Sequence, residues 1–230
     1  MYADVKMRGI FITGTSTGVG KTHIGKLLSQ ALRARNIRVV PRKPVESGCD
    51  SVDGELLPAD AQALMQAAAY PGELADVCRY RFQPPLSPAR AARLADTRLT
   101  TGELVRVCKH GSKDGFVLVE GAGGFYSPLT EDGLNADLAE ALQLPLLLVA
   151  ENRLGILNHV LLNAEAIRAR RLNLAAVILN DLDSEQHEHM DNAADLDSML
   201  HCPVYAVGYN ENSLPEELID TLAQPVTATA

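Results

Sequence analysis

Short apolar runs alternate with longer amphipathic stretches along this chain, which predicts alternating strands and helices. The runs predicted as strands are residues 9–13, 37–40, 116–120, 146–150, 175–180 and 204–207. The stretches predicted as helices are residues 21–35, 59–69, 101–110, 136–142, 156–171, 185–200 and 215–222. Runs such as Pro145-Leu146-Leu147-Leu148-Val149 are apolar at every position, which is typical of parallel strands covered on both faces. The pattern therefore predicts an α/β fold: a doubly wound, mostly parallel sheet between two layers of helices.

Two segments lie outside this alternation. Residues 70–88 have weak periodicity, and their Pro-Pro and Ser-Pro steps favour extended or turn conformations. We interpret them as an excursion from the sheet that lies near a substrate. Residues 224–230 have little to pack and are expected to fray, so residues 1–223 are predicted to form one domain.

Composition narrows the class of protein. The chain has 230 residues, of which 47% are hydrophobic and 22% are charged, as in an ordinary globular protein. The formal net charge is −8, which argues against general nucleic-acid binding because such binding depends on clustered Lys and Arg. We expect no nucleic-acid partner, and any anionic ligand must meet a local positive site.

The cysteines and the first residues indicate the compartment. The four cysteines lie far apart and form no C-x-x-C pair, so we expect buried thiols rather than a zinc site or a disulfide framework. Asp4, Lys6 and Arg8 leave no room for the apolar core of a signal peptide. No apolar run approaches the length of a membrane span, so a cytoplasmic protein without membrane contact is expected.

A glycine-rich run, Gly14-Thr15-Ser16-Thr17-Gly18-Val19-Gly20-Lys21-Thr22, joins the first predicted strand to the first predicted helix. Small residues let backbone N–H groups approach phosphate oxygens, Lys21 provides a positive charge, and the Thr22 hydroxyl can ligate Mg²⁺. The strict G-x-x-x-x-G-K-[ST] pattern requires glycine where Thr15 stands, so this loop is a variant. The context predicts a P-loop NTPase-like three-layer sandwich that binds a nucleoside triphosphate.

Three further charged residues are predicted to lie near this loop. Lys43 follows the second predicted strand, where it can reach a γ-phosphate, and Glu120 ends the third predicted strand before small residues. Asp60 begins a predicted helix. Taken singly, these are a loop charge, a turn signal and a helix N-cap. Together, Thr22, Asp60 and Glu120 form a plausible oxygen ligand set for Mg²⁺ beside a nucleotide.

Five elements, in this order and at these spacings, resemble the dethiobiotin synthetases. They are the loop Gly14 to Thr22, the segment Lys43-Pro44-Val45-Glu46-Ser47-Gly48, Asp60, the turn Val119-Glu120-Gly121-Ala122-Gly123-Gly124, and Leu154-Gly155-Ile156-Leu157-Asn158-His159. The resemblance implies that 7,8-diaminononanoate, CO₂ and ATP with Mg²⁺ give dethiobiotin, ADP and phosphate. A carbamate of the diamine and its anhydride with phosphate would be the intermediates.

The resemblance also implies a role for each matching residue. Lys43 would be the catalytic lysine. Thr17, Ser47 and Asn158 would bind the diamine, with a homodimer completing the site near Asn158. Thr22, Asp60 and Glu120 would hold the metal. The residues implied to contact the nucleotide are Gly18, Val19, Gly20, Lys21, Thr22, Asp60, Glu120, Gly121, Ala122, Gly123, Asn180 and Asp181.

Some positions depart from the family pattern. Ala89 replaces a common histidine, and Gly208-Tyr209-Asn210-Glu211-Asn212 lacks the Gly-x-x-Pro element that usually flanks the base. Asn180-Asp181-Leu182-Asp183 is similar to the N-K-x-D guanine signature of GTPases, with Asp181 in the place of lysine. ATP is favoured, and use of other nucleotides stays open.

Other functions share this fold. A partition-type ATPase switch typically carries a lysine early in the loop, and none stands at Gly14-Thr15-Ser16. A cobyrinate-type amide ligase normally has an appended glutaminase domain, for which 230 residues are expected to leave no room. A catalytically idle relative that still binds nucleotide is a third alternative.

Overall fold

The computed structural model describes residues 7–184 and 190–223. Its central sheet has six parallel strands in the order β10-β9-β8-β1-β7-β2. They are β1 (Gly9–Gly14), β2 (Val39–Arg42), β7 (Phe116–Gly124), β8 (Leu146–Glu151), β9 (Leu174–Asn180) and β10 (Val204–Val207). From β1 the chain passes to β2 at one edge of the sheet and then fills the place between them with β7. The next strand, β8, lies on the opposite side of β1. The predicted doubly wound sheet is confirmed, and its switch point lies at β1.

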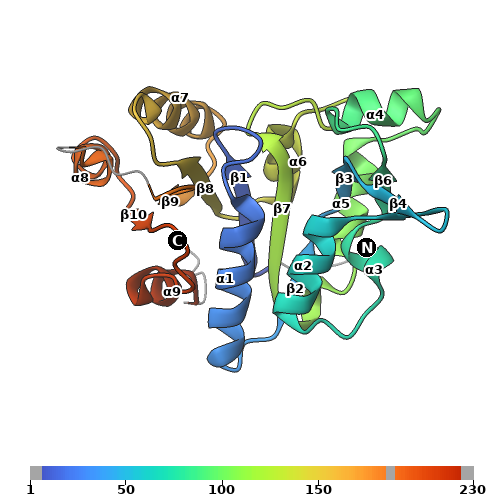
Figure 1. Cartoon of the computed structure of the whole chain (residues 1–230), viewed down its shortest axis with the longest axis horizontal. Coiled ribbons are helices and arrows are strands. Elements are labelled where there is room, and N and C mark those ends of the chain that lie inside the picture. The colour runs from blue at the N-terminus through green and yellow to red at the C-terminus, as the bar shows by residue number, and fades with distance from the viewer. Residues whose placement is uncertain (1–6, 185–189, 224–230) are drawn as a thin grey trace.

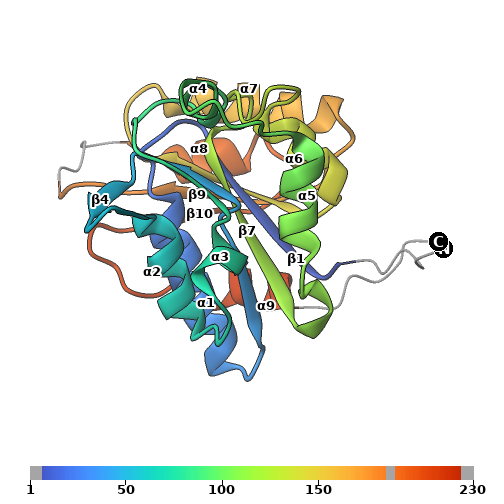
Figure 2. The ribbon, with the colours of Figure 1, turned by 90° about the vertical axis from the view of Figure 1, so that its right-hand side faces the viewer.

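Helices cover both faces of the sheet (Figures 1 and 2). Ile10 and Ile12 of β1 face α1 (Lys21–Ala34), α2 (Ala59–Ala68) and α9 (Glu216–Ala223). Phe11, between them, faces the opposite layer, because successive side chains of a strand point to opposite faces. The helices of that layer are α4 (Pro88–Leu94), α5 (Thr101–Lys109), α6 (Asn135–Leu142), α7 (Ile156–Ala169) and α8 (Asn192–Asp197).

Several short elements between β2 and β7 were not predicted. Strand β3 (Val45–Ser47) pairs with β6 (Tyr80–Phe82), and β4 (Asp50–Val52) forms a hairpin with β5 (Glu55–Leu57). Helix α3 (Leu74–Val77) and a 3₁₀ turn (Ser112–Asp114) are equally short. Elements of three or four residues are too short to show a hydrophobic period, so the sequence pattern could not reveal them.

Some predicted boundaries were wrong. The second strand was predicted to end at Val40, whereas β2 continues through Pro41 to Arg42. Because β2 is an edge strand that pairs only with β7, the missing N–H of Pro41 is tolerated. The helix predicted over residues 185–200 is α8, which begins after Asp191 because the Asp191 side chain accepts from Ala194 N–H at 3.1 Å. Residues 185–189 and the predicted fraying tail, 224–230, lie outside the described residues.

A buried arginine fixes the end of β2. Arg42 is fully buried and donates to the backbone carbonyls of Pro41 at 2.7 Å, Val107 at 3.2 Å and His110. Its guanidinium also lies 5.4 Å from the centre of the Tyr70 ring. Since Val107 and His110 lie in the last turn of α5 and just after it, Arg42 ties β2 to the helix end where positive charge is favoured. The backbone is therefore anchored one residue before Lys43.

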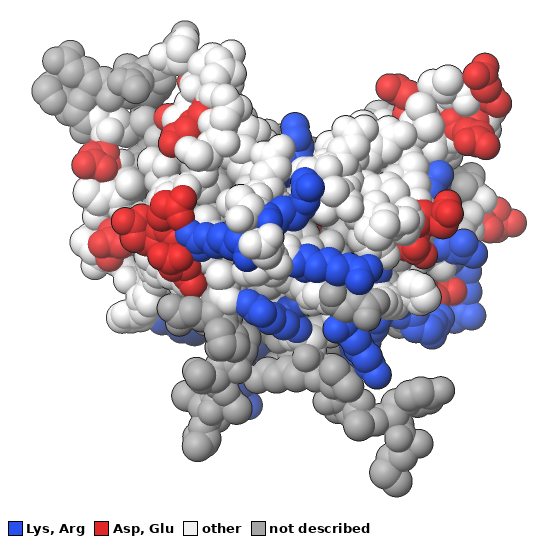
Figure 3. Space-filling view, turned by 90° about the horizontal axis from the view of Figure 1, so that it is seen from below, with Lys and Arg blue, Asp and Glu red and all other residues white. Residues whose placement is uncertain are grey.

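Although the chain is acidic overall, its basic and acidic side chains are not evenly distributed over the surface. Seen from the edge of the sheet opposite the glycine-rich loop, Lys and Arg gather across the middle and acidic residues lie toward the sides (Figure 3). Arg35 pairs with Glu216 and, at 2.8 Å, with Asp220, and so joins the end of α1 to α9. In the described ranges, no helix is both long enough and apolar enough to cross a membrane.

The cysteines are free thiols. Cys49, Cys78 and Cys108 are buried, as predicted, whereas Cys202 is only half-buried. Burial raises the pKa of the Cys108 thiol to about 12. At neutral pH this thiol is protonated and inert, which supports a packing role for it.

Candidate active site

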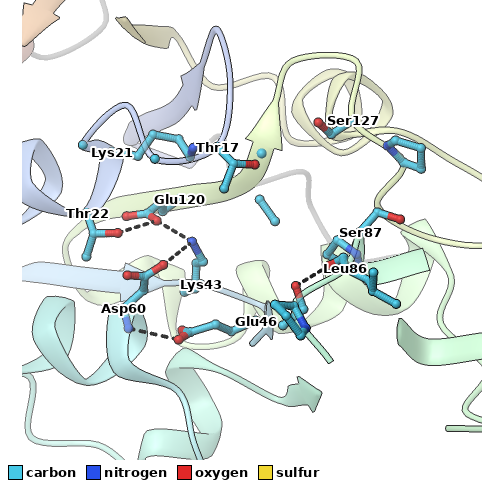
Figure 4. Close-up of a pocket in the computed structure, with 18 residues that line it drawn as sticks. Thr17, Lys21, Thr22, Lys43, Glu46, Asp60, Leu86, Ser87, Glu120 and Ser127 are labelled. Carbon is cyan, nitrogen blue, oxygen red and sulfur yellow. Dashed lines mark hydrogen bonds and ion pairs between the residues drawn. The ribbon is translucent and has the colours of Figure 1, made fainter. Parts of the chain in front are cut away.

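A cavity of about 810 Å³ opens at the carboxyl ends of β1, β2 and β7 (Figure 4). It is lined by Thr17, Gly18, Gly20, Lys21, Thr22, Lys43, Glu46, Ser47, Asp60, Pro85, Leu86, Ser87, Pro88, Glu120, Ala122, Gly123, Ser127 and Pro128. This is the place where open α/β sheets bind ligands, at the switch point of the strand order. Most of the residues predicted from the sequence therefore meet in one cavity.

The glycine-rich loop has the backbone that its sequence predicts. Gly18 and Gly20 have φ values of 80° and 92°, in the left-handed region that favours glycine. A Cβ at Gly20 would lie 2.1 Å from the Asn180 side-chain nitrogen, so this position also requires glycine for space. In the part of the chain that the structure describes, no side chain caps α1, which leaves its first N–H groups free to bind an anion.

Lys21 lies folded back on this loop, where its Nζ donates to the Ser16 carbonyl at 3.0 Å. Burial and the positive charge of Lys43 together lower the Lys21 pKa to about 8, against the opposing effect of Glu120 and Asp60. Bound phosphates would restore the charged form, since an anion nearby favours the ammonium.

Lys43 is the centre of a buried ion network. Its Nζ contacts Glu120 Oε1, lies 3.1 Å from Asp60 Oδ2 and donates to the Gly121 carbonyl at 3.3 Å. Burial alone would disfavour the charged lysine, but Glu120 and Asp60 outweigh it and raise the Lys43 pKa. Lys43 is thus a permanently charged group, held by the same carboxylates that were predicted to bind metal.

The oxygen atoms around Glu120 suit a magnesium ion. The Thr22 hydroxyl donates to Glu120 Oε1 at 2.9 Å, and Glu120 Oε2 is buried without a hydrogen-bond partner among the residues that the structure describes. The Asp60 carboxylate is 44% exposed. Burial alone would raise its pKa, but Lys43, the Thr22 hydroxyl and Lys21 together outweigh burial and lower it. Among the described residues no group of three or more His, Cys, Asp and Glu gathers as a metal cage. Mg²⁺ needs no such cage, because it takes one or two carboxylates together with phosphate oxygens and water.

Glu46 is a site residue that sequence reasoning missed. It is 7% exposed, and its two carboxylate oxygens accept from the N–H groups of Asp60 and Ala61, each at 3.0 Å. Burial raises the Glu46 pKa, against the lowering effect of Lys43 and of these two hydrogen bonds. The reading of Asp60 as a helix N-cap was wrong, since Pro58 occupies that position and Glu46 provides the cap. Glu46 lies on β3, 14 residues before Asp60, so its capping of α2 leaves no local signal in the sequence.

Asn135 is a second missed residue, and it clamps the last residues of β7. Its Nδ2 donates to the Gly124 carbonyl at 2.9 Å and to the Ala122 carbonyl, while Oδ1 accepts from Ala122 N–H at 3.2 Å. Asn135 is fully buried at the start of α6. The backbone of Ala122 and Gly123, which lines the cavity, is therefore held in one shape.

The excursion that we expected near a substrate lines the cavity opposite the glycine-rich loop. Ser47 donates to the Leu86 carbonyl at 2.6 Å, and Gly48 N–H donates to the Pro84 carbonyl at 3.2 Å. These bonds hold the Pro85 to Pro88 segment against the mouth of the cavity. Ser47 thus has a structural partner in addition to its predicted contact with substrate.

Five predicted residues do not line the cavity. Val19 is the buried residue of the loop itself, and Gly121 directly follows Glu120. Asn180 is 3% exposed and donates to the Val19 carbonyl at 3.1 Å, so it supports the loop from below. Asp181 accepts from Asn152 at 2.8 Å, and Asn158 is exposed on α7. Nucleobase contacts of Asn180 and Asp181 and substrate contact by Asn158 stay predictions.

The fold and the site define a class: a P-loop NTPase fold with a lysine and two carboxylates beside the phosphate loop. The signal recognition particle receptor FtsY from Elizabethkingia anophelis in complex with GDP is similar in structure, with a TM-score of 0.52 and 16% identity. The match covers 98% of this chain and 66% of that chain, and it shows the fold alone.

Sequence comparison narrows the class to one family. The family described as "AAA domain" matches residues 8–215. The ATP-dependent dethiobiotin synthetase BioD of Anaeromyxobacter sp. (strain K) is 41% identical over 197 residues, which cover 85% of this chain and 86% of that protein. The protein of the same name from Caulobacter vibrioides (strain ATCC 19089 / CIP 103742 / CB 15) is 39% identical and covers 84% and 85%. The chain belongs to the ATP-dependent dethiobiotin synthetase family, and the resemblance drawn from the five sequence elements is confirmed.

Proposed function

We propose that this chain uses ATP to close the ureido ring of dethiobiotin from 7,8-diaminononanoate and CO₂. The observation that carries the proposal is the position of Lys43, buried between Glu120 and Asp60 in the cavity that also contains the phosphate loop. Family membership supports the same reaction. A binding switch would need no second buried cation in front of the phosphate loop.

The reaction divides into three steps. A substrate amine attacks the carbon of CO₂, which forms an N–C bond and releases a proton to give a carbamate. A carbamate oxygen then attacks the γ-phosphorus of ATP, and the bond to the ADP oxygen breaks. The second amine attacks the carbamate carbon and loses a proton, the ring closes, and the bond from that carbon to the bridging oxygen breaks as phosphate leaves with this oxygen. Each step needs positioning and stabilisation of negative charge more than covalent help from the protein.

The residues of the cavity match these needs. The backbone from Gly18 to Lys21 and the end of α1 would bind the phosphates, and Lys21 would balance their charge. Lys43 would contact the carbamate and the transferring phosphoryl group, where donors in a buried site are most effective. Thr22, Asp60 and Glu120 would hold Mg²⁺, which supplies further neutralisation of the phosphate charge.

The diamine would lie between the loop and the Pro85 to Pro88 segment. Thr17 and Ser47, which both line the cavity, would hydrogen-bond the carbamate or amine end. The backbone at Ala122 and Gly123, held by Asn135, would contact substrate or phosphate. ATP is the favoured nucleotide, with Asn180 and Asp181 on the side of the base.

We also propose a cytoplasmic homodimer, in which a second copy completes the site near Asn158. Leu154, just before the start of α7, and Leu162, one turn after Asn158 on α7, are 78% and 58% exposed. Exposed apolar side chains on a helix and directly before it are consistent with a protein contact there. The start of α7 would then offer its N–H groups to the substrate carboxylate.

A coupled assay of ADP release tests the proposed reaction. The wild-type protein is expected to release ADP only when 7,8-diaminononanoate and bicarbonate are both present with ATP and Mg²⁺. ADP release that requires DNA, or that ignores the diamine, would support a partition-type switch and reject the proposal. Release that needs a carboxylic acid and an amide donor instead would support the amide ligase.

A further inference from the structure

Helix α2 carries Asp60 into the site but has no capping side chain of its own. Pro58 occupies the N-cap position and makes no side-chain hydrogen bond. The N–H groups in the first turn of a helix have no partner within the helix, and leaving them unpaired in a half-buried place is costly. The first turn of α2 therefore depends on an acceptor from elsewhere in the fold.

Glu46 is that acceptor. Its Oε1 accepts from Asp60 N–H at 3.0 Å (Figure 4). Its Oε2 accepts from Ala61 N–H, also at 3.0 Å. Strand β3 directs the side chain, because Val45 and Ser47 point to the other face of the strand. Val45 is buried in the core with Phe82 of the paired strand, so the backbone beneath Glu46 is firmly held.

Asp60 is consequently held at two points. Glu46 binds its backbone nitrogen, and Lys43 Nζ lies 3.1 Å from its Oδ2. Lys43 and Glu46 are three residues apart on one segment, so that segment determines both the position of the Asp60 backbone and the direction of its carboxylate. Burial does not determine this direction, since the Asp60 side chain is 44% exposed.

We propose that Glu46 is a positioning residue, which fixes the first turn of α2 and thereby directs the Asp60 carboxylate into the metal site. The inference rests on the proposed role of Asp60 as a metal ligand. Neither the spacing of the sequence elements nor the family resemblance assigned a role to Glu46. Groups that orient a metal ligand typically change metal affinity or activity by about 10–100-fold when they are replaced.

The test is the Mn²⁺ affinity of a Glu46→Gln variant. Glutamine keeps the size of the side chain but places an NH₂ group against one of the two N–H donors. We expect Mn²⁺ to bind at least about tenfold more weakly in the presence of a non-hydrolysable ATP analogue, as measured by electron paramagnetic resonance. Analogue affinity measured without metal should stay unchanged, because the phosphate loop is intact.

Two comparisons separate positioning from general stability. Glu103→Gln is the matched control, since Glu103 accepts from Thr100 N–H at 2.9 Å as a capping residue of α5 and does not line the cavity. It should lower the melting temperature without changing Mn²⁺ affinity. In an Asp60→Asn background, Glu46→Gln should add no further loss of Mn²⁺ affinity, because the carboxylate that it directs is gone.

The role of Glu46 would be overturned if the folded Glu46→Gln variant bound Mn²⁺ as tightly as the wild-type protein. It would also be overturned if the losses of Mn²⁺ affinity from Glu46→Gln and Asp60→Asn added in the double variant. Circular dichroism checks that each variant is folded at the temperature of the measurement. A wild-type protein that binds Mn²⁺ and nucleotide but forms no ring would reject the proposed reaction, and the same Mn²⁺ comparison would still decide the role of Glu46.

Discussion

Replacing Lys43 with alanine should lower turnover by at least about 10³-fold while ATP still binds. Lys43 is the buried cation expected at the carbamate and the transferring phosphoryl group, and no other side chain that lines the cavity can replace it there. Lys21, the loop amides and the end of α1 remain to hold the phosphates. Single-turnover ADP formation would measure the chemical step, and a fluorescent ATP analogue would measure binding.

Although Lys43→Ala should lose turnover, it should gain affinity for a metal ion. In the protein without nucleotide, Lys43 occupies the space between Asp60 and Glu120 and so competes with a metal ion for both carboxylates. Its removal should therefore tighten Mn²⁺ binding. Lys109→Ala is a suitable control, because Lys109 is an exposed lysine at the far end of α5. Near wild-type turnover by Lys43→Ala would remove this residue from the mechanism.

Replacing Glu120 with glutamine should both destabilise the protein and disable the site. Glu120 has a fully buried side chain that pairs with Lys43 and accepts from Thr22. Removing one partner of a buried ion pair costs about 3–5 kcal/mol of unfolding free energy, because the other charge is left uncompensated. Urea denaturation would measure this loss. Turnover should fall by at least about 100-fold, since a proposed metal ligand is lost with the charge.

A double variant checks the cause of the instability. If the uncompensated Lys43 ammonium destabilises Glu120→Gln, then replacing Lys43 with methionine in the same chain should restore much of the stability but none of the activity. The Lys26→Met change on α1 is the matched control, since Lys26 does not line the cavity. Additive losses of stability in the Lys43 and Glu120 double variant would contradict the buried pair as the cause.

Much of the fold could be predicted from the sequence because the central strands are long and apolar throughout. Runs such as Leu146 to Val149 identify buried parallel strands, and the glycine-rich loop identifies the switch point of the sheet. Lys43 and Glu120 were found because parallel strands end at one edge, so polar residues after different strands meet there. These inferences need only order and spacing along the chain.

The rest depends on tertiary contacts that leave no local signal. Glu46 caps a helix from a three-residue strand, and Asn135 clamps the end of a strand that lies before it in the sequence. Arg42 could not be found for a different reason: this buried arginine donates to backbone carbonyls of α5 and of His110 just after it, and only the fold brings these near it. The tertiary structure determines which hydrogen-bond donors and acceptors such residues meet.

The most direct test of the central claim is the fate of carbon from bicarbonate. The protein, ATP, Mg²⁺, 7,8-diaminononanoate and carbon-13 bicarbonate would be incubated together, and products would be analysed by mass spectrometry alongside ADP. The proposed reaction predicts a ureido product that carries one labelled carbon, formed in equal amount with ADP. ADP formed without labelled product, or a product without the label, would contradict ring closure through a carbamate.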